Sequence, residues 1–140
     1  MRNHESADDP TADLLMAVAR SMRGAFVSAL REYDVTPAQA RALRVVADDG
    51  PVRLSALAER LGIAPRSATE VVDHLETRGL VRREPDPDDR RAVRAVSTTE
   101  AARLHQRLHD ARHAAAEERL ARLSAHDRAE LERILRLLVD

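Results

Sequence analysis

The chain of 140 residues has no cysteine and no tryptophan, and its only aromatic side chains are Phe26 and Tyr33. The lack of cysteine excludes disulfides, thiolate metal ligands and cysteine-based redox sensing. The scarcity of aromatic rings leaves almost no platform on which the bases of single-stranded nucleic acid could stack. The core must therefore be built from aliphatic side chains.

Lysine is also absent, so all 23 basic side chains are arginines, against 24 acidic ones and a formal net charge of -1. This balance argues against a uniformly basic nucleic-acid binder, but phosphate contact depends on where the arginines are placed. No apolar run approaches the length of a bilayer span, and the N-terminus lacks the apolar stretch of a signal peptide. We therefore expect a cytoplasmic protein with no membrane partner.

Hydrophobic residues make up 44% of the chain and charged residues 34%, which favours a folded, helix-rich protein with a solvated surface. The length suits one core, so we expect residues 1–140 to form a single domain. Residues 1–10 are polar and acidic and end in Pro10, and they are predicted to be a frayed tail.

Helical periodicity is clearest in the N-terminal third and the C-terminal third of the chain. Apolar residues recur every three or four positions from Thr11 to about Tyr33, which predicts an amphipathic helix. The next helix has Thr36 as N-cap, Pro37 at its first position and Gln39 to complete a capping box. Two more helices are predicted near the C-terminus, one capped by Thr98 or Thr99 and the last beginning at Ser124 with Asp127.

The middle of the chain predicts shorter elements. A very short strand is expected over residues 52–54, followed by a brief helix with Ser55 as N-cap and Gly62 as its stop. Another helix is expected from about Pro65 to Arg78, with Gly79 as the left-handed residue after it. The runs "LVRRE" and "AVRAV" then predict a hairpin around the loop "PDPDDRR". Two short helices followed by a hairpin describe a winged helix-turn-helix, in which the second helix enters the DNA major groove.

The second helix of this pair has one apolar face, formed by Ala68, Val71, Val72 and Leu75. Helical spacing then turns outward, or to the flanks, Arg66, Ser67, Glu70, Asp73, His74 and Thr77. Arg66 could contact guanine in a bidentate manner, and Ser67 or Thr69 could reach a base edge or a phosphate. The alternative is a solvated helix face stabilised by an Arg66–Glu70 pair at i,i+4 spacing.

The expected wing places four arginines near one edge of the module: Arg82, Arg83, Arg90 and Arg91. Pro85 and Pro87 stiffen the loop, and Asp88 stands two residues before Arg90, where it could orient the guanidinium. An extended arginine can enter the minor groove, where the negative potential is strong. The alternative is an acidic, solvated hairpin.

The run "LSALAERLGIAPRSATEVVDHLETRGLVRREPDPDDRRAVRAVSTTEAARL" resembles the MarR family of winged helix-turn-helix transcriptional regulators, and "RREPDPDDRRAV" resembles its wing. The resemblance implies a mostly α fold with a small β-hairpin wing. It divides the chain into dimerisation helices at 11–34 and 98–140 and a DNA-binding module at 35–97. It also implies a homodimer that binds a pseudo-palindromic operator in double-stranded DNA, usually represses transcription, and releases DNA when a small-molecule effector binds between the dimer helices and the module.

By the same resemblance, Asp88 and Arg90 match the family's wing aspartate and wing-tip arginine, and Ser55 matches a phosphate-facing position. Arg66, Ser67 and Thr69 match its recognition-helix contacts. The chain departs from the family pattern at Glu70, Ser97 and Ala101. The complete expected DNA-binding set is Ser55, Arg66, Ser67, Thr69, Glu70, His74, Arg82, Arg83, Asp88, Arg90 and Arg91.

Two other functions remain open from the sequence. His105, His109 and His113 lie at i, i+4 and i+8, and an adjacent pair could bind zinc, which would make a zinc-responsive regulator. The near-neutral charge also allows a winged-helix protein-interaction module without DNA binding. An enzyme is not expected, because no nucleophile–base pattern or glycine-rich phosphate loop is found. No cofactor is expected, and the residues that would bind an effector are not assigned.

Overall fold

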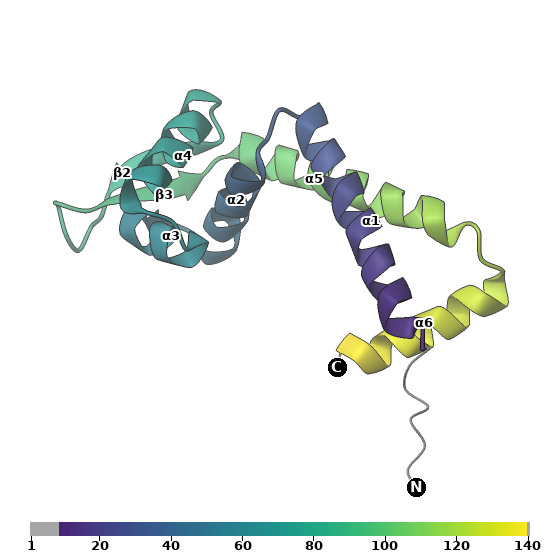
Figure 1. Cartoon of the computed structure of the whole chain (residues 1–140). Coiled ribbons are helices and arrows are strands. Elements are labelled where there is room, and N and C mark those ends of the chain that lie inside the picture. The colour runs from purple at the N-terminus through teal and green to yellow at the C-terminus, as the bar shows by residue number, and fades with distance from the viewer. Residues whose placement is uncertain (1–8, 140) are drawn as a thin grey trace, which may run out of the picture. The chain divides into compact units, whose positions relative to one another are not determined.

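The computed structural model describes residues 9–139, so most of the predicted frayed tail lies outside the described residues. The helices and strands follow the order α1 (Thr11–Glu32), α2 (Pro37–Asp49), β1 (Val52–Arg53), α3 (Leu54–Leu61), α4 (Pro65–Thr77), β2 (Val81–Pro85), β3 (Val93–Ser97), α5 (Thr99–Leu120) and α6 (Ala125–Val139) (Figure 1). This confirms the predicted mostly α fold with a small hairpin. No helix in this part of the chain is long and apolar enough to cross a membrane.

The chain divides into two compact units. The first to be described, the DNA-module unit, comprises residues 27–110, and the second, the terminal-helix unit, comprises residues 1–26 and 111–140. The boundaries fall inside α1 and α5, so each of these helices contributes residues to both units. The DNA-module unit is thus longer at both ends than the predicted module of 35–97.

Aliphatic side chains fill the core of the DNA-module unit, as the composition requires. The largest fully buried ones come from five different elements and are Leu30, Val46, Leu57, Val72, Leu75 and Val81. Ala58 on α3 and Ala68 on α4 are also buried, at 3% and 0% exposure, which agrees with the close helix crossing of a helix-turn-helix. Gly62 provides the left-handed turn after α3, with φ of 65°.

The three strands form one antiparallel sheet in the order β1-β3-β2. Strands β2 and β3 pair from Val81 opposite Ser97 to Pro85 opposite Val93, and this hairpin is called the wing below. The wing loop, residues 86–92, connects the two strands and extends away from α3 and α4 (Figure 1). The short β1 pairs with β3 on its other side, so the sheet joins the wing to the helix-turn-helix.

Local capping explains where most helices begin. The Thr36 hydroxyl accepts a hydrogen bond from the Gln39 N–H at 3.1 Å, and the Gln39 side chain accepts one from the Thr36 N–H at 3.2 Å, which confirms the capping box. Ser124 likewise accepts from the Asp127 N–H at 3.1 Å. The prediction of Ser55 as an N-cap is wrong: α3 begins at Leu54, with Arg53 as N-cap and no side-chain cap. The helix begins two residues earlier than predicted because β1 ends directly before it.

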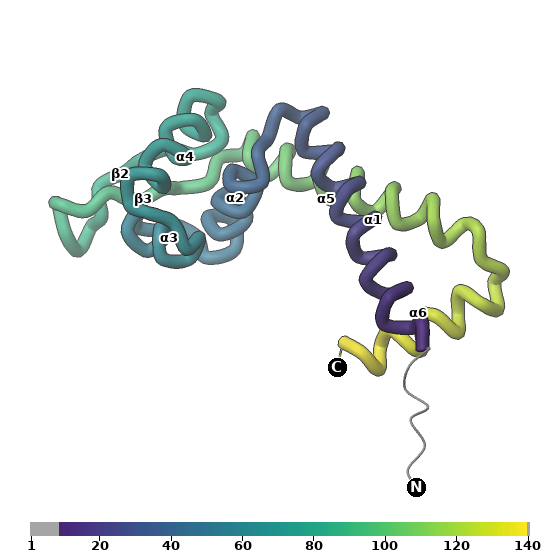
Figure 2. The backbone as a smooth tube through the Cα atoms, in the orientation of Figure 1, coloured from purple at the N-terminus to yellow at the C-terminus, as the bar shows by residue number. Residues whose placement is uncertain are grey.

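The terminal-helix unit contains the first part of α1, the second part of α5, and α6. After α5 the chain reverses over residues 121–124 and continues as α6 (Figure 2). Arg128 on α6 is bonded to Glu117 on α5 at 2.6 Å, and the Arg112 guanidinium lies 4.5 Å from the centre of the Phe26 ring. No residue of α6 from Ala125 to Val139 is buried.

Candidate nucleic-acid interface

Helix α4 is held by its apolar face and exposes its polar face. Ala68, Val72 and Leu75 are each 0% exposed, whereas Val71 is half-buried. The predicted outward side chains are all exposed, at Arg66, Ser67, Glu70, Asp73, His74 and Thr77, and so is Thr69. The helix therefore presents a polar surface on a rigid support, which is what base recognition requires.

Arg66 and Glu70 form the predicted i,i+4 pair only loosely. The Arg66 Nε lies 3.9 Å from the Glu70 Oε1, and the Arg66 side chain is 93% exposed. An exposed ion pair at this distance contributes little to stability. The guanidinium can therefore turn to an acceptor on a ligand at small cost, so the pair does not prevent the proposed guanine contact.

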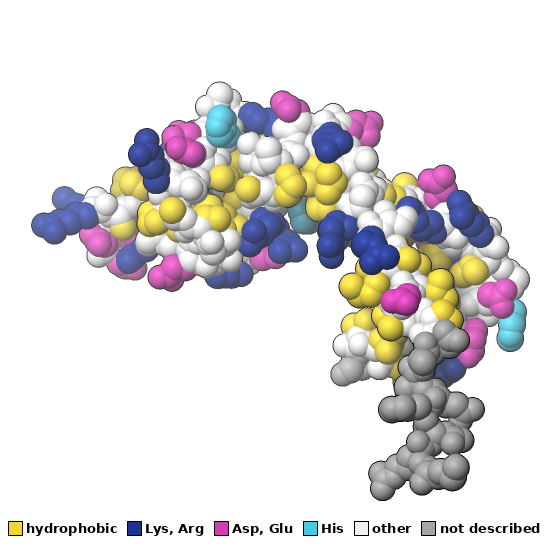
Figure 3. Space-filling view, viewed as in Figure 1, with side chains coloured by type: hydrophobic (Ala, Val, Ile, Leu, Met, Phe, Trp, Pro, Cys, Tyr) yellow, Lys and Arg dark blue, Asp and Glu magenta, His cyan; other side chains and the backbone are white. Residues whose placement is uncertain are grey.

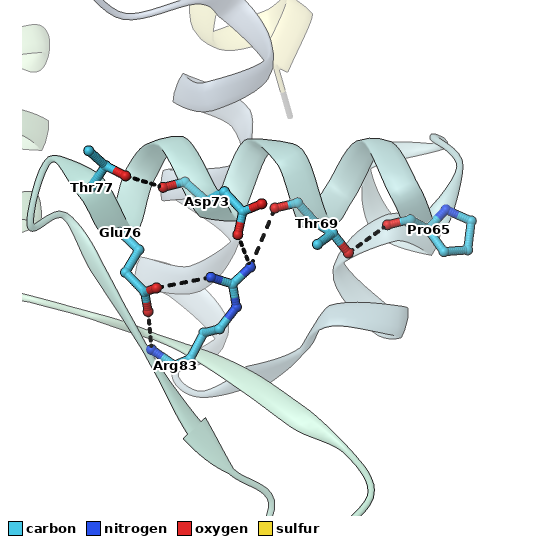
Figure 4. A network of polar contacts seen from close by, with 6 residues as sticks. All are labelled: Pro65, Thr69, Asp73, Glu76, Thr77 and Arg83. Atoms are coloured by element: carbon cyan, nitrogen blue, oxygen red, sulfur yellow. Dashed lines mark hydrogen bonds and ion pairs between the residues drawn. The ribbon is translucent and has the colours of Figure 1, made fainter.

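Arg83 is half-buried and bonded in a network between the wing and α4 (Figure 4). Its guanidinium lies 3.0 Å from Glu76 Oε1 and 2.5 Å from Asp73 Oδ1. Its backbone N–H donates to the other Glu76 oxygen at 3.1 Å. Arg83 therefore fastens strand β2 to α4, and its guanidinium is already committed to two carboxylates.

The remaining predicted wing arginines, Arg82, Arg90 and Arg91, are exposed. Arg82 lies 3.8 Å from Glu84 with its side chain 62% exposed. Arginine side chains project from the far end of the wing (Figure 3, dark blue, left). The wing thus carries positive charge at the part of the module that extends furthest from its core.

The predicted pairing of Asp88 with Arg90 is not found. In the described part of the chain, the Asp88 carboxylate accepts no hydrogen bond and forms no ion pair, and Asp88 is bonded through its backbone N–H instead. The neighbouring Asp89 accepts a hydrogen bond from the Arg91 N–H at 3.0 Å. Adjacency in the sequence could not show which of the three wing aspartates is bonded, because that depends on the turns of the loop.

Asp86 is the wing aspartate that the sequence analysis missed. It is 7% exposed, and its Oδ2 accepts a hydrogen bond from Arg53 Nε at 2.6 Å. Its Oδ1 accepts from the Asp88 N–H at 2.8 Å. The Arg53 hydrogen bond, followed by that from Asp88, lowers the pKa of Asp86 from 3.8 to about 2. An aspartate bonded two residues along is a recognisable turn signal, but Arg53 lies 33 residues away and gives no local signal.

This geometry was compared with known proteins. Residues 35–93 match the model of the MarR family. The HTH-type transcriptional repressor MdtR of Bacillus subtilis is 29% identical over 99 residues, which cover 69% of this chain and 64% of that repressor. The transcriptional regulator Tm0710 of Thermotoga maritima superimposes with a TM-score of 0.82 at 27% identity, covering 94% of this chain and 92% of that one. The family model covers helices α2, α3 and α4 and strand β2, so the chain is similar to the MarR family over residues 35–93.

The relatives that match the chain, MdtR among them, are HTH-type transcriptional regulators. A mutant of MepR from S. aureus, solved bound to an oligodeoxyribonucleotide, shares the fold with a TM-score of 0.79. That protein is 18% identical, with coverage of 94% of this chain and 97% of that one. The match spans 64% of the length of the MdtR repressor.

The three histidines considered as zinc ligands, His105, His109 and His113, lie on α5, away from the DNA-binding residues in sequence. Within residues 9–139, no three histidine, cysteine or acidic side chains are grouped so that they could hold a metal ion. Among the described residues, no additional zinc ligand is grouped with His105, His109 and His113. The geometry gives no support to the zinc-responsive alternative.

Proposed function

We propose that this regulator binds double-stranded DNA as a homodimer at a pseudo-palindromic operator and represses transcription. One observation carries the proposal: α4 has a buried apolar face and an exposed polar face, beside a wing with arginines at its far end. A recognition helix in the major groove and an arginine in the minor groove require this pair of features.

The exposed residues divide naturally between the two grooves. Arg66 at the start of α4 reads a guanine edge, and Ser67, Thr69, Glu70 and His74 lie on the same exposed helix. The Thr69 hydroxyl donates to the Pro65 carbonyl at 3.1 Å, so it is placed to accept, not to donate, toward DNA.

The wing supplies the second set of contacts. Arg90 and Arg91 in the wing loop reach the minor groove, while Arg82 and Ser55 face phosphates. Ser55 is exposed in the first turn of α3, where backbone N–H groups also point outward. Arg83 supports these contacts from within the protein, and Asp88 is left out of the binding set.

Exposed apolar side chains support the homodimer. They lie on α1 and α6 (Figure 3, yellow) and include Leu14 at 62%, Leu15 at 50%, Val18 at 55%, Leu137 at 70% and Leu138 at 64% exposure. Between the end of α5 and α6 there is also a groove of about 410 Å³, lined by Leu120, Arg128, Leu131, Glu132, Leu135, Arg136 and Val139. Exposed apolar surface of this kind marks an interface, and a second copy of these helices would bury it.

The response to an effector rests on the family alone. A small molecule that releases the DNA is part of the proposal, but no pocket in the DNA-module unit identifies its class. We place the regulator in the cytoplasm, where its operator would be, and propose no enzymatic activity for it.

Selection of bound fragments from random duplex DNA tests the proposal. A dimer should select two inverted half-sites about one helical turn apart. Affinity should then fall steeply with salt, because phosphate contacts release counterions. If no DNA sequence is enriched, and if the affinity for any partner that is found depends only weakly on salt concentration, the protein-interaction module is favoured instead.

A further inference from the structure

Asp86, at the start of the wing loop, is bonded to strand β1 and to both ends of the loop. Its carboxylate binds Arg53 of β1 through one oxygen and the Asp88 N–H through the other, at 2.6 Å and 2.8 Å. Its own N–H donates to the Ala92 carbonyl across the loop at 3.0 Å. The same residue therefore ties the loop to β1, fixes its first turn and closes its two ends.

This arrangement restrains the wing loop and does not itself present a group that binds DNA. Asp86 is 7% exposed, and a carboxylate would repel a phosphate backbone if it were presented to one. The residues that it restrains, 87–91, include both loop arginines. A loop that is ordered before DNA arrives loses less conformational entropy on binding than a mobile one.

We propose that Asp86 is a positioning residue for DNA recognition: anchored by Arg53 and by the Asp88 N–H, it holds the wing loop so that Arg90 and Arg91 are in place to enter the minor groove. The inference rests on the proposed DNA binding by the wing. A buried acidic residue would thus support the DNA binding that the basic residues of the wing perform.

The direction in which one substitution changes the affinity for DNA distinguishes a positioning role from a purely electrostatic one. Removing a negative charge near DNA should strengthen binding if charge alone matters. Asp86→Asn removes the charge and the Arg53 ion pair but keeps an oxygen for the Asp88 N–H. If Asp86 positions the loop, the variant should instead bind operator DNA about tenfold more weakly, roughly the effect of losing one groove contact.

Asp88→Asn is the matched control, because it makes the same charge change two residues away on a carboxylate that is exposed and unbonded in the described structure. It should bind operator DNA as tightly as the wild type or more tightly. Arg53→Gln removes the same ion pair from the other side; because it also removes a positive charge, it is compared in a background that lacks Arg90 and Arg91, where it should cause no further loss if it acts by positioning them. This second variant serves if Asp86→Asn fails to fold, which circular dichroism would reveal.

The experiment measures operator affinity by fluorescence anisotropy over a series of salt concentrations, with the full chain. In a background lacking both loop arginines, Arg90→Ala with Arg91→Ala, the Asp86→Asn change should cause no further loss, because Asp86 acts through them. In the otherwise wild-type chain, Asp86→Asn should also make operator affinity depend less steeply on salt concentration. Operator binding by Asp86→Asn at wild-type strength or above overturns the inference, whereas a wild-type chain that binds no duplex DNA overturns the proposed function itself.

Discussion

At the scale of single residues, Arg90 is the side chain from which we expect the largest wing effect. It is exposed in the wing loop and is not packed into the core. Arg90→Ala should weaken operator binding by about 1 to 3 kcal/mol, as for one good groove contact. Arg91→Ala, measured beside it, shows which of the two arginines reaches the groove. Sedimentation should show an unchanged dimer for both variants, and unchanged affinity for both would remove the wing from the DNA interface.

Arg66 should determine sequence preference more than it determines affinity. Its nearly complete exposure at the start of α4 allows a bidentate contact with guanine. Arg66→Ala should therefore relax the base preference at one position of each half-site. Sequencing of fragments selected by the variant measures this, and an unchanged selected motif would show that a different residue reads that base.

The depressed pKa of Asp86 predicts a pH dependence of folding stability. Because the folded-state pKa is about 2 and the ordinary value is 3.8, the ionised carboxylate stabilises the fold fully above about pH 4. That contribution is lost as the pH falls toward 2. The difference in Tm between the wild type and Asp86→Asn should be largest near pH 5 and should shrink on acidification. A constant difference across this range would mean that the Arg53 ion pair does not stabilise the fold.

The sequence predicted the exposed side chains of α4 correctly, but it predicted the role of the wing side chains only in part. The helical period alone placed the outward residues of α4, because every side chain on a helix has a fixed direction. Arg83 was grouped with the DNA contacts, yet it is bonded to Asp73 and Glu76. Alternation along β2 gave no sign that helix carboxylates lie within reach of that arginine.

At the scale of elements, the Arg83 network decides how the wing is fixed to the recognition helix. Arg83→Ala would leave two carboxylates without their partner and should lower the free energy of unfolding by about 1 to 2 kcal/mol. Operator binding should weaken as well, since α4 and the wing would no longer be held in one geometry. Chemical denaturation measures the first effect and anisotropy the second.

Arg82→Ala is the control for this network. Arg82 is the neighbouring arginine on β2, exposed and only 3.8 Å from a single carboxylate. Its replacement should change stability by less than about 0.5 kcal/mol. Equal losses of stability in the two variants would contradict the role assigned to Arg83.

The start of a helix could be predicted from the sequence where the capping residues lie within a few positions of one another. The capping box at Thr36 and the Ser124–Asp127 start of α6 each need only a few consecutive residues, and both were predicted. Ser55 has the right residue type for an N-cap, but β1 pairs with β3 immediately before it and the helix begins at Leu54. Val52 of β1 pairs with Ala95, which lies 43 residues further along the chain, so the residue types near Ser55 cannot show this pairing.

At the scale of the whole molecule, the apolar surface of α1 and α6 predicts a dimer that depends on a few leucines. Leu138→Asp places a charge on this surface, at a side chain that is 64% exposed in the single chain. The dimer dissociation constant should rise roughly tenfold or more, because burying one leucine contributes about 1.5 to 3 kcal/mol. Analytical ultracentrifugation measures this, with Glu118→Gln on α5 as an exposed control. A dimer of wild-type strength would move the interface away from the end of α6.

The sequence by itself determined the helices, the hairpin, the inward and outward faces of α4 and the resemblance to the MarR family. These features depend on period, on caps and on motifs of adjacent residues, so each one is complete within a short stretch of chain. Only the tertiary structure decided that Arg83 and Asp86 are held inside the module while Asp88 is not. Their partners, on α4 and β1, are brought near by the packing of the helices and the pairing of the strands, and such contacts leave no trace in local order.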